Sequence, residues 1–141
     1  MSAEKNISEA RRWLKTAEDD LEAALVLFEN SKFPYACFLA QQAGEKALKA
    51  VWYAADADPW CHSVLKLVND LEEIDLKLYA RLRPLKKSAG LLDKFYIPTR
   101  YPNGLPDLTP AEVYNVEDAA SGLDAARKII SASRELTEEA G

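Results

Sequence analysis

The chain has 141 residues, of which 48% are hydrophobic and 29% charged, with a net charge of -5 and a pI near 5.0. This acidic balance argues against a dedicated duplex-DNA binder, because such proteins carry a basic surface. Two cysteines and one histidine supply neither a disulfide framework nor a zinc ligand set. We therefore expect free thiols in a reducing cytoplasm, no metal and no cofactor.

The longest apolar region, residues 33–57, is interrupted by glutamine, glutamate and lysine, so we do not expect it to span a membrane. Apolar residues recur at helical spacing along almost the whole chain, and no stretch alternates as a strand does. The first helix is expected over residues 8–30, where Asn6 and Glu9 can form a capping box. A second helix, over residues 34–55, begins at a proline, which suits the first turn of a helix.

A third, short helix is expected over residues 63–73, capped by Ser63. Residues 76–96 form a further helical stretch. Pro84 lies inside it, and an internal proline breaks or kinks a helix, so we place a bend near Arg83.

Residues 97–107 contain three prolines and an Asn-Gly pair, which predicts a loop. Thr109, Pro110 and Glu112 then give a strong helix start, with a cap, a first-turn proline and a glutamate at the third position. The last helix is expected over residues 110–136, with fraying after it.

These elements predict an all-α fold, an antiparallel up-and-down bundle of four main helices plus a short extra helix. No internal repeat or linker divides the chain, so residues 1–141 are expected to form a single domain.

The second helix has two contrasting faces. Small residues at the 4-3 spacing of a packing seam predict that a neighbouring helix approaches closely; they stand at positions 36, 40, 43, 47, 50 and 54. The opposite arc carries aromatic, amide and charged side chains: Phe38, Gln42, Glu45, Lys46, Lys49 and Tyr53. This arc is either a binding face or an ordinary solvated face.

His62 is the one side chain whose ordinary pKa lies near neutrality. It is either a turn residue bonded to nearby backbone or a functional group that contacts phosphate or transfers a proton. The segment Thr99–Asn103 offers a second candidate, because Arg100 has a planar fork suited to phosphate and Tyr101 a face on which a base can stack. The alternative is that Arg100 pairs with an acidic neighbour and Tyr101 fills the end of the bundle.

The second-helix run from Phe38 to Ala50, His62 before a Val-Leu-Lys-Leu helix, and the Thr-Arg-Tyr-Pro-Asn segment resemble the HEPN domain. The name stands for higher eukaryotes and prokaryotes nucleotide-binding, and the resemblance covers nearly the whole chain. It implies a bundle of four or five helices, usually a homodimer. It also implies either a partner of a minimal nucleotidyltransferase, often in a toxin–antitoxin pair, or a metal-independent ribonuclease.

The ribonuclease members use an arginine followed four to six residues later by a histidine, and this sequence lacks that pair. No histidine follows Arg100, and no arginine lies between Arg12 and Arg81. We therefore expect a non-catalytic module that binds a nucleotide or RNA. Its candidate contacts are Lys46, Lys49, His62, Arg100 and Tyr101.

Gln42 and Glu45 are expected to orient the lysines. In the main alternative, Phe38, Trp52, Tyr53 and Lys49 form a dimer or partner interface and no nucleotide binds. The third alternative is a ribonuclease that relies on His62.

Overall fold

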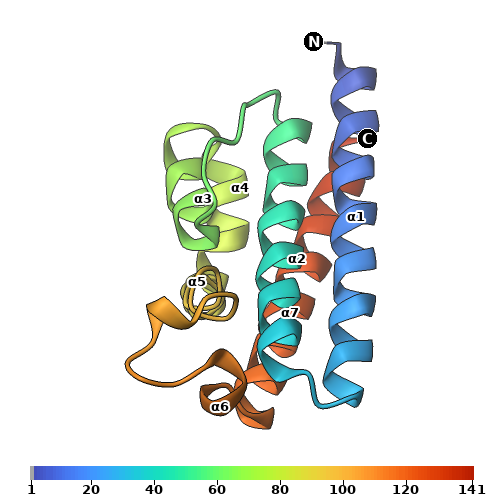
Figure 1. The fold of residues 1–141 in the computed structure, drawn as a ribbon. Coiled ribbons are helices and arrows are strands. Elements are labelled where there is room, and N and C mark those ends of the chain that lie inside the picture. Colours follow the sequence, from blue (N-terminus) through green and yellow to red (C-terminus); the bar gives the residue numbers. More distant parts are fainter. Residues whose placement is uncertain (1) are drawn as a thin grey trace.

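The computed structural model describes residues 2–141, and every regular element within that range is a helix (Figure 1). The three long helices are α1 (Ala3–Glu29), α2 (Phe33–Ala54) and α7 (Val116–Ala140). In the view of Figure 1, α1 descends, α2 rises, α4 (Leu76–Leu82) descends and α7 rises. The expected all-α, up-and-down bundle is confirmed.

Shorter elements cover one side of the bundle. They are α3 (Val64–Asp70), a 3-10 turn (Leu71–Glu73), α4, a second 3-10 turn (Arg83–Leu85), α5 (Lys86–Asp93), a third 3-10 turn (Pro102–Gly104) and α6 (Pro110–Val113). Pro84 lies in the second turn, so the bend expected near Arg83 is confirmed. Figure 1 shows α5 almost end on, so its axis runs between the front and the back of the molecule.

The helix starts follow side-chain capping. Ser63 Oγ accepts a hydrogen bond from the Lys66 amide at 3.0 Å, and Thr109 forms the expected capping box with Glu112. The box expected at Asn6 is wrong. Helix α1 begins at Ala3, after Ser2, and Asn6 occupies a buried position inside the helix.

The single helix expected over residues 110–136 is also wrong. The chain leaves the helix at Tyr114, and Asn115 starts α7 with a second capping box, in which Asp118 is the reciprocal partner. A helix start with its own cap competes with continuation of the preceding helix. At its other end α7 continues to Ala140 instead of fraying.

Helix α2 packs against α1, α7, α3 and α5, and its small-residue seam is largely buried. Five alanines of that seam are fully buried: Ala36, Ala40, Ala43, Ala47 and Ala50. Gly44 extends the close approach, because a Cβ at this position would lie 2.5 Å from Leu92 Cδ1. The missing side chain at Gly44, beside the predicted seam, therefore lets α5 lie close to α2.

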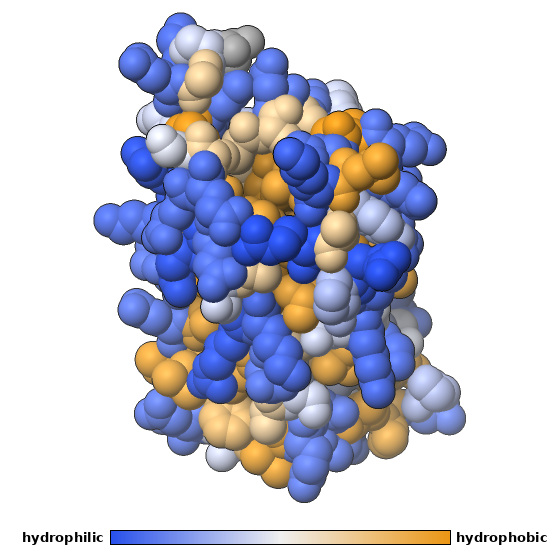
Figure 2. Space-filling model, turned by 180° about the vertical axis from the view of Figure 1, so that it is seen from behind, coloured by the Kyte–Doolittle hydropathy of each residue, from blue (hydrophilic) through white to orange (hydrophobic). Residues whose placement is uncertain are grey.

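Seen from behind, the molecule has a mostly hydrophilic surface, with apolar side chains showing in a hollow in its upper half (Figure 2). Residues of α4 and α7, among them Leu78 and Leu136, line a groove on this side. None of the helices in residues 2–141 combines the length and the apolar character that a membrane crossing requires.

Candidate functional site

Three polar side chains of α2 are buried in a ladder at i, i+4 spacing. Gln41 is 0% exposed, Glu45 4% and Lys49 9%. Glu45 Oε1 accepts a hydrogen bond from Gln41 Nε2 at 3.2 Å, and Glu45 Oε2 accepts one from Lys49 Nζ at 3.0 Å. Because burial of a charge is costly unless it is paired, this ladder is a built feature of the core. The solvated-face alternative is wrong for Glu45 and Lys49.

His62 adds to the ladder from the link between α2 and α3. Its Nδ1 lies 3.3 Å from Glu45 Oε2, and its backbone carbonyl accepts a hydrogen bond from Gln41 Nε2 at 3.2 Å. A carboxylate only accepts, so Nδ1 carries the proton in this contact and Nε2 is the nitrogen left for a ligand. The imidazole side chain is 64% exposed. His62 is thus held by a buried carboxylate, not by the nearby backbone.

Asp93, the last residue of α5, fixes the chain next to His62. Its carboxylate accepts hydrogen bonds from Ser63 Oγ at 2.7 Å, from the Val64 amide at 2.6 Å and from the Leu65 amide at 3.2 Å. The start of α3 is therefore anchored to the end of α5. The sequence analysis missed Asp93, because nothing local links it to a helix start about thirty residues earlier.

Tyr96 joins His62 to the loop after α5, and it too was missed from the sequence. The ring of His62 stacks on Tyr96 with centroids 5.2 Å apart and an interplanar angle of 17°. The Arg100 guanidinium carbon lies 4.8 Å from the Tyr96 centroid, 4.4 Å from that of Phe38 and 5.1 Å from that of Tyr101. The structure therefore brings His62 and Arg100 to the same tyrosine.

The backbone further fixes Arg100, whose Nε donates a hydrogen bond to the Tyr96 carbonyl at 2.8 Å. Within residues 2–141, no carboxylate lies at ion-pair distance from its guanidinium. Tyr101 beside it is 48% exposed. The alternative in which Arg100 pairs with an acid and Tyr101 fills the bundle end does not describe this loop.

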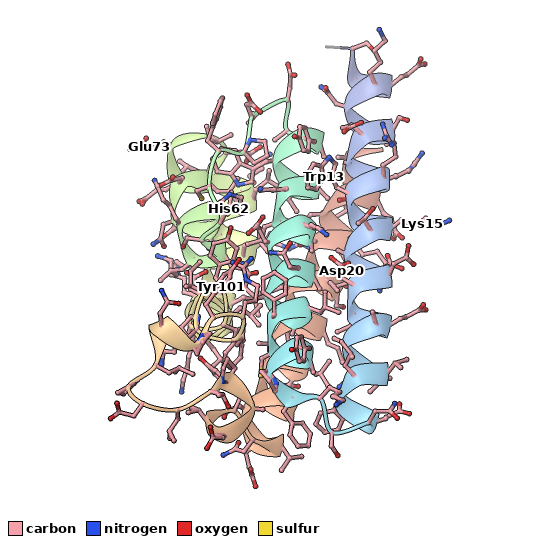
Figure 3. The ribbon with its side chains drawn as sticks, viewed as in Figure 1. Trp13, Lys15, Asp20, His62, Glu73 and Tyr101 are labelled. Atoms are coloured by element: carbon pink, nitrogen blue, oxygen red, sulfur yellow. The ribbon has the colours of Figure 1, made fainter. Side chains whose placement is uncertain are left out.

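A second aromatic cluster lies on the other side of α2, between α2 and α1; Figure 3 shows Trp13 and Asp20 on this side and His62 and Tyr101 on the opposite one. Trp13 stacks on Tyr53 with centroids 5.4 Å apart, and Lys49 Nζ lies 5.7 Å from the Trp13 ring. Lys46 is paired with Asp20 at 2.7 Å. Both lysines that the sequence nominated for phosphate therefore already have a carboxylate partner.

Tyr53, Trp52 and Gln42 complete the set of nominated residues. Burial, followed by the charges of Asp58 and Glu9, raises the pKa of the Tyr53 hydroxyl. Trp52 is a core residue whose Nε1 donates to the Leu67 carbonyl at 3.0 Å, so it offers no surface to a partner. Gln42 Nε2 donates to Gln41 Oε1 at 2.8 Å and so extends the buried ladder.

In the part of the chain that the structure describes, no three His, Cys, Asp or Glu side chains come together in a way that could hold a metal ion. Around Tyr96 the structure brings together the exposed imidazole of His62, the guanidinium of Arg100 and the rings of Phe38 and Tyr101.

Comparison with known proteins confirms the predicted resemblance. The HEPN domain model matches residues 10–136. TT1696 from Thermus thermophilus is 39% identical, with a TM-score of 0.82, and the match covers 91% of this chain and 98% of that one. ST0689, described as an archaeal HEPN homologue, is 29% identical with a TM-score of 0.75, covering 92% of this chain and 98% of the other. A Methanocaldococcus jannaschii protein named "Putative toxin MJ1304" is 29% identical over 95% of this chain and 91% of its own length.

Proposed function

The chain belongs to the HEPN domain family, and we propose that it is a nucleotide- or nucleic-acid-binding module of that family, with its binding site at Arg100. The observation that carries this proposal is the state of Arg100, a cation held on three aromatic rings without a carboxylate partner among residues 2–141. A guanidinium in a fixed orientation suits a phosphate group, which it can bind through two parallel hydrogen bonds.

The neighbouring side chains supply the other contacts that a nucleotide needs. Tyr101 is half-exposed next to Arg100, and base–aromatic stacking contributes about 1–3 kcal/mol per base. His62 reaches the same cluster through Tyr96 and can donate or accept a hydrogen bond through Nε2. In this proposal Arg100 binds phosphate, Tyr101 stacks on the base and His62 is an accessory contact.

In this proposal the lysines and the glutamate of α2 do not contact the ligand. Lys49 donates a hydrogen bond to Glu45, and Glu45 in turn holds the imidazole of His62. Lys46 is engaged by Asp20 on the α1 side. We therefore centre the ligand site on Arg100, Tyr101 and His62, and assign Glu45, Gln42 and Lys49 to the support of that site.

The biological setting we propose is a toxin–antitoxin pair, in which the chain acts in the cytoplasm as a single-domain, homodimeric partner of a minimal nucleotidyltransferase. The likeness to a protein named as a toxin over almost the whole length of both chains supports this assignment. Light scattering tests the dimer, for which we expect twice the chain mass of 15.7 kDa. Co-purification with a nucleotidyltransferase encoded beside the gene tests the partner.

One observation favours a second candidate, RNA cleavage. His62 and Arg100 meet at Tyr96 although the arginine–histidine motif is missing from the sequence, and cleavage needs a proton-transfer group beside a cation. RNA that is cut by the native protein but not by His62→Ala would establish this activity and overturn the non-catalytic assignment.

Isothermal calorimetry with ATP and with a short RNA tests the binding proposal directly. We expect Arg100→Ala to weaken binding at least tenfold, which corresponds to about 1.4 kcal/mol. The matched control is Arg12→Ala, which removes an exposed arginine paired with Glu9 on α1 and should leave the affinity unchanged. The absence of heat with both ligands would favour the interface alternative at Phe38 and Tyr53, in which no nucleotide binds. Equal binding by Arg100→Ala and the native protein would overturn the assignment of the ligand site to Arg100.

A further inference from the structure

Positive charge is concentrated in one segment of this acidic chain. Residues 76–106 contain seven of the 18 lysines and arginines but only one of the 23 acidic residues, Asp93. The carboxylate of Asp93 is already occupied by Ser63 and by two amides of α3. The segment therefore has a strongly positive net charge, whereas the rest of the chain carries the negative charge.

Helix α5 joins the turn at Pro84 to the chain beside His62. Its last residue, Asp93, is bonded to the chain beside His62, and its first residue follows the 3-10 turn Arg83–Leu85. Lys87 and Lys94 are exposed and lie seven residues apart, about 10 Å along the same face of the helix. Neither lysine has an ion-pair partner among residues 2–141.

A basic groove begins where α5 begins. It has a volume of about 450 Å³ and lies between the turn at Pro84 and Leu85 and the α7 residues Arg127 and Lys128. Lys128 is paired with Asp124, and Arg81 at the edge of the groove is held by Glu135 and Glu139.

Arg127 and Arg83 are exposed, and no carboxylate of the described chain pairs with either. Arg127 lines the groove, Arg83 lies in the turn before α5, and Lys87 and Lys94 follow along α5, so these four are exposed cations between the groove and the segment that holds Arg100. We call these four residues the α5 track.

We propose that the α5 track binds the phosphate backbone of a single-stranded nucleic acid whose end nucleotide occupies the Arg100 site. This inference rests on the proposed function. A row of unpaired cations that ends at exposed aromatic rings is the arrangement that binds single strands, since the cations follow the backbone and the rings stack on bases. An acidic polypeptide would match the cations but would leave the half-exposed ring of Tyr101 without a stacking partner.

Fluorescence anisotropy with oligouridylates of two and twelve nucleotides tests the track. We expect the native protein to bind the longer strand at least tenfold more tightly. The double variant Lys87→Ala/Lys94→Ala should lose most of the extra affinity for the longer strand. Its affinity for the dinucleotide should equal that of the native protein. The slope of log affinity against log salt should also fall by about 0.7 for each phosphate that the variant no longer neutralises. An oligodeoxyribonucleotide of equal length should show the same loss of affinity, because the track reads phosphate.

The matched control is Lys5→Ala/Lys15→Ala, which removes the same charge from exposed positions on α1 and should change neither affinity. Equal affinity for the two lengths, or equal binding of the long strand by both double variants, would overturn the track and leave the Arg100 site intact. Dinucleotide binding that is insensitive to Arg100→Ala would instead overturn the proposed function. Lysine-dependent binding of polyglutamate, with RNA binding unaffected, would identify an acidic protein partner and overturn the track.

Discussion

Two cation–aromatic contacts flank α2, and they differ in one respect. On the α1 side, Lys49 lies over Trp13 and its ammonium is bonded to buried Glu45. On the α5 side, Arg100 lies on three rings and has no carboxylate partner in the described chain. The positive charge of Lys49 is therefore compensated by Glu45, whereas the positive charge of Arg100 is not compensated by any carboxylate in the described chain. The first contact is part of the buried ladder, and the second belongs to the site at which we propose that a phosphate binds.

The largest effect is expected on the neutralised side, from Glu45→Ala. This change leaves the Lys49 ammonium buried without its carboxylate, and a broken buried pair costs about 3–5 kcal/mol. Urea unfolding measures the loss. Glu45→Gln, which keeps the shape and an accepting oxygen, is the control and should lose clearly less. A loss below about 1 kcal/mol for Glu45→Ala would mean that water replaces the carboxylate easily.

A smaller loss should follow from Gly44→Ala, which tests the close approach that brings α5 to the site. The added Cβ would lie 2.5 Å from Leu92 Cδ1, and overpacking of a core typically costs about 1–3 kcal/mol. The matched control is Gly90→Ala, where the nearest atom, Leu65 Cδ2, lies 3.7 Å away and alanine also favours the helix. Equal stability of the two variants would contradict this prediction, because it would mean that α5 can move away from α2 at no cost in free energy.

Arg100→Ala should destabilise the protein less than Glu45→Ala while it abolishes much of the ligand affinity. Partly exposed cation–ring contacts are worth about 0.5–1 kcal/mol each, and Arg100 makes three of them and one hydrogen bond to the Tyr96 carbonyl, so we expect a loss of about 1–2 kcal/mol. Thermal unfolding of the ligand-free protein measures it. A loss as large as that of Glu45→Ala would show that Arg100 is a structural cation like Lys49 and would remove the contrast between the two sides.

The smallest effect concerns thiol reactivity, because it changes no stability. Burial, followed by the charge of Asp118, raises the pKa of the Cys37 thiol to about 12, so it remains protonated and inert at pH 8. Cys61 is partly exposed and adjoins His62. In the native protein a thiol reagent should label Cys61 only, and bound nucleotide should slow that labelling.

Cys61→Ser and Cys37→Ser assign the labelled position, and denaturant should expose both thiols equally. Rapid native labelling of Cys37 would contradict the tight packing of α2. Labelling of Cys61 that nucleotide leaves unchanged would place the ligand away from His62.

The sequence was sufficient for the features that depend on local pattern. The alanine seam of α2, the cap at Ser63, the bend at Pro84 and the capping box at Thr109 all follow from residue spacing within one or two turns. The second cap, at Asn115, has the same kind of signal, an acceptor three residues before Asp118. The apolar spacing on both sides of Asn115 nevertheless favours one continuous helix, so the local cap signal and the periodicity conflict.

The site itself depended on contacts between distant segments. His62 and Arg100 were nominated by their chemistry, but the residues that hold them, Asp93 and Tyr96, act across about thirty residues of sequence. The burial of Glu45 and Lys49 could not be predicted from the sequence either, because charged side chains usually lie on the surface unless a partner compensates their charge. Periodicity predicts which face of a helix packs, but not that its polar face is covered.

The carboxylate of Asp93 makes the candidate site observable without any ligand. Its two bonds to the Val64 and Leu65 amides close only while the start of α3 rests on the end of α5. Hydrogen exchange at these two amides therefore reports how often His62 and Tyr96 separate. If the two segments open as one unit, both amides should exchange at the same free energy, and a bound nucleotide should slow both by the same factor.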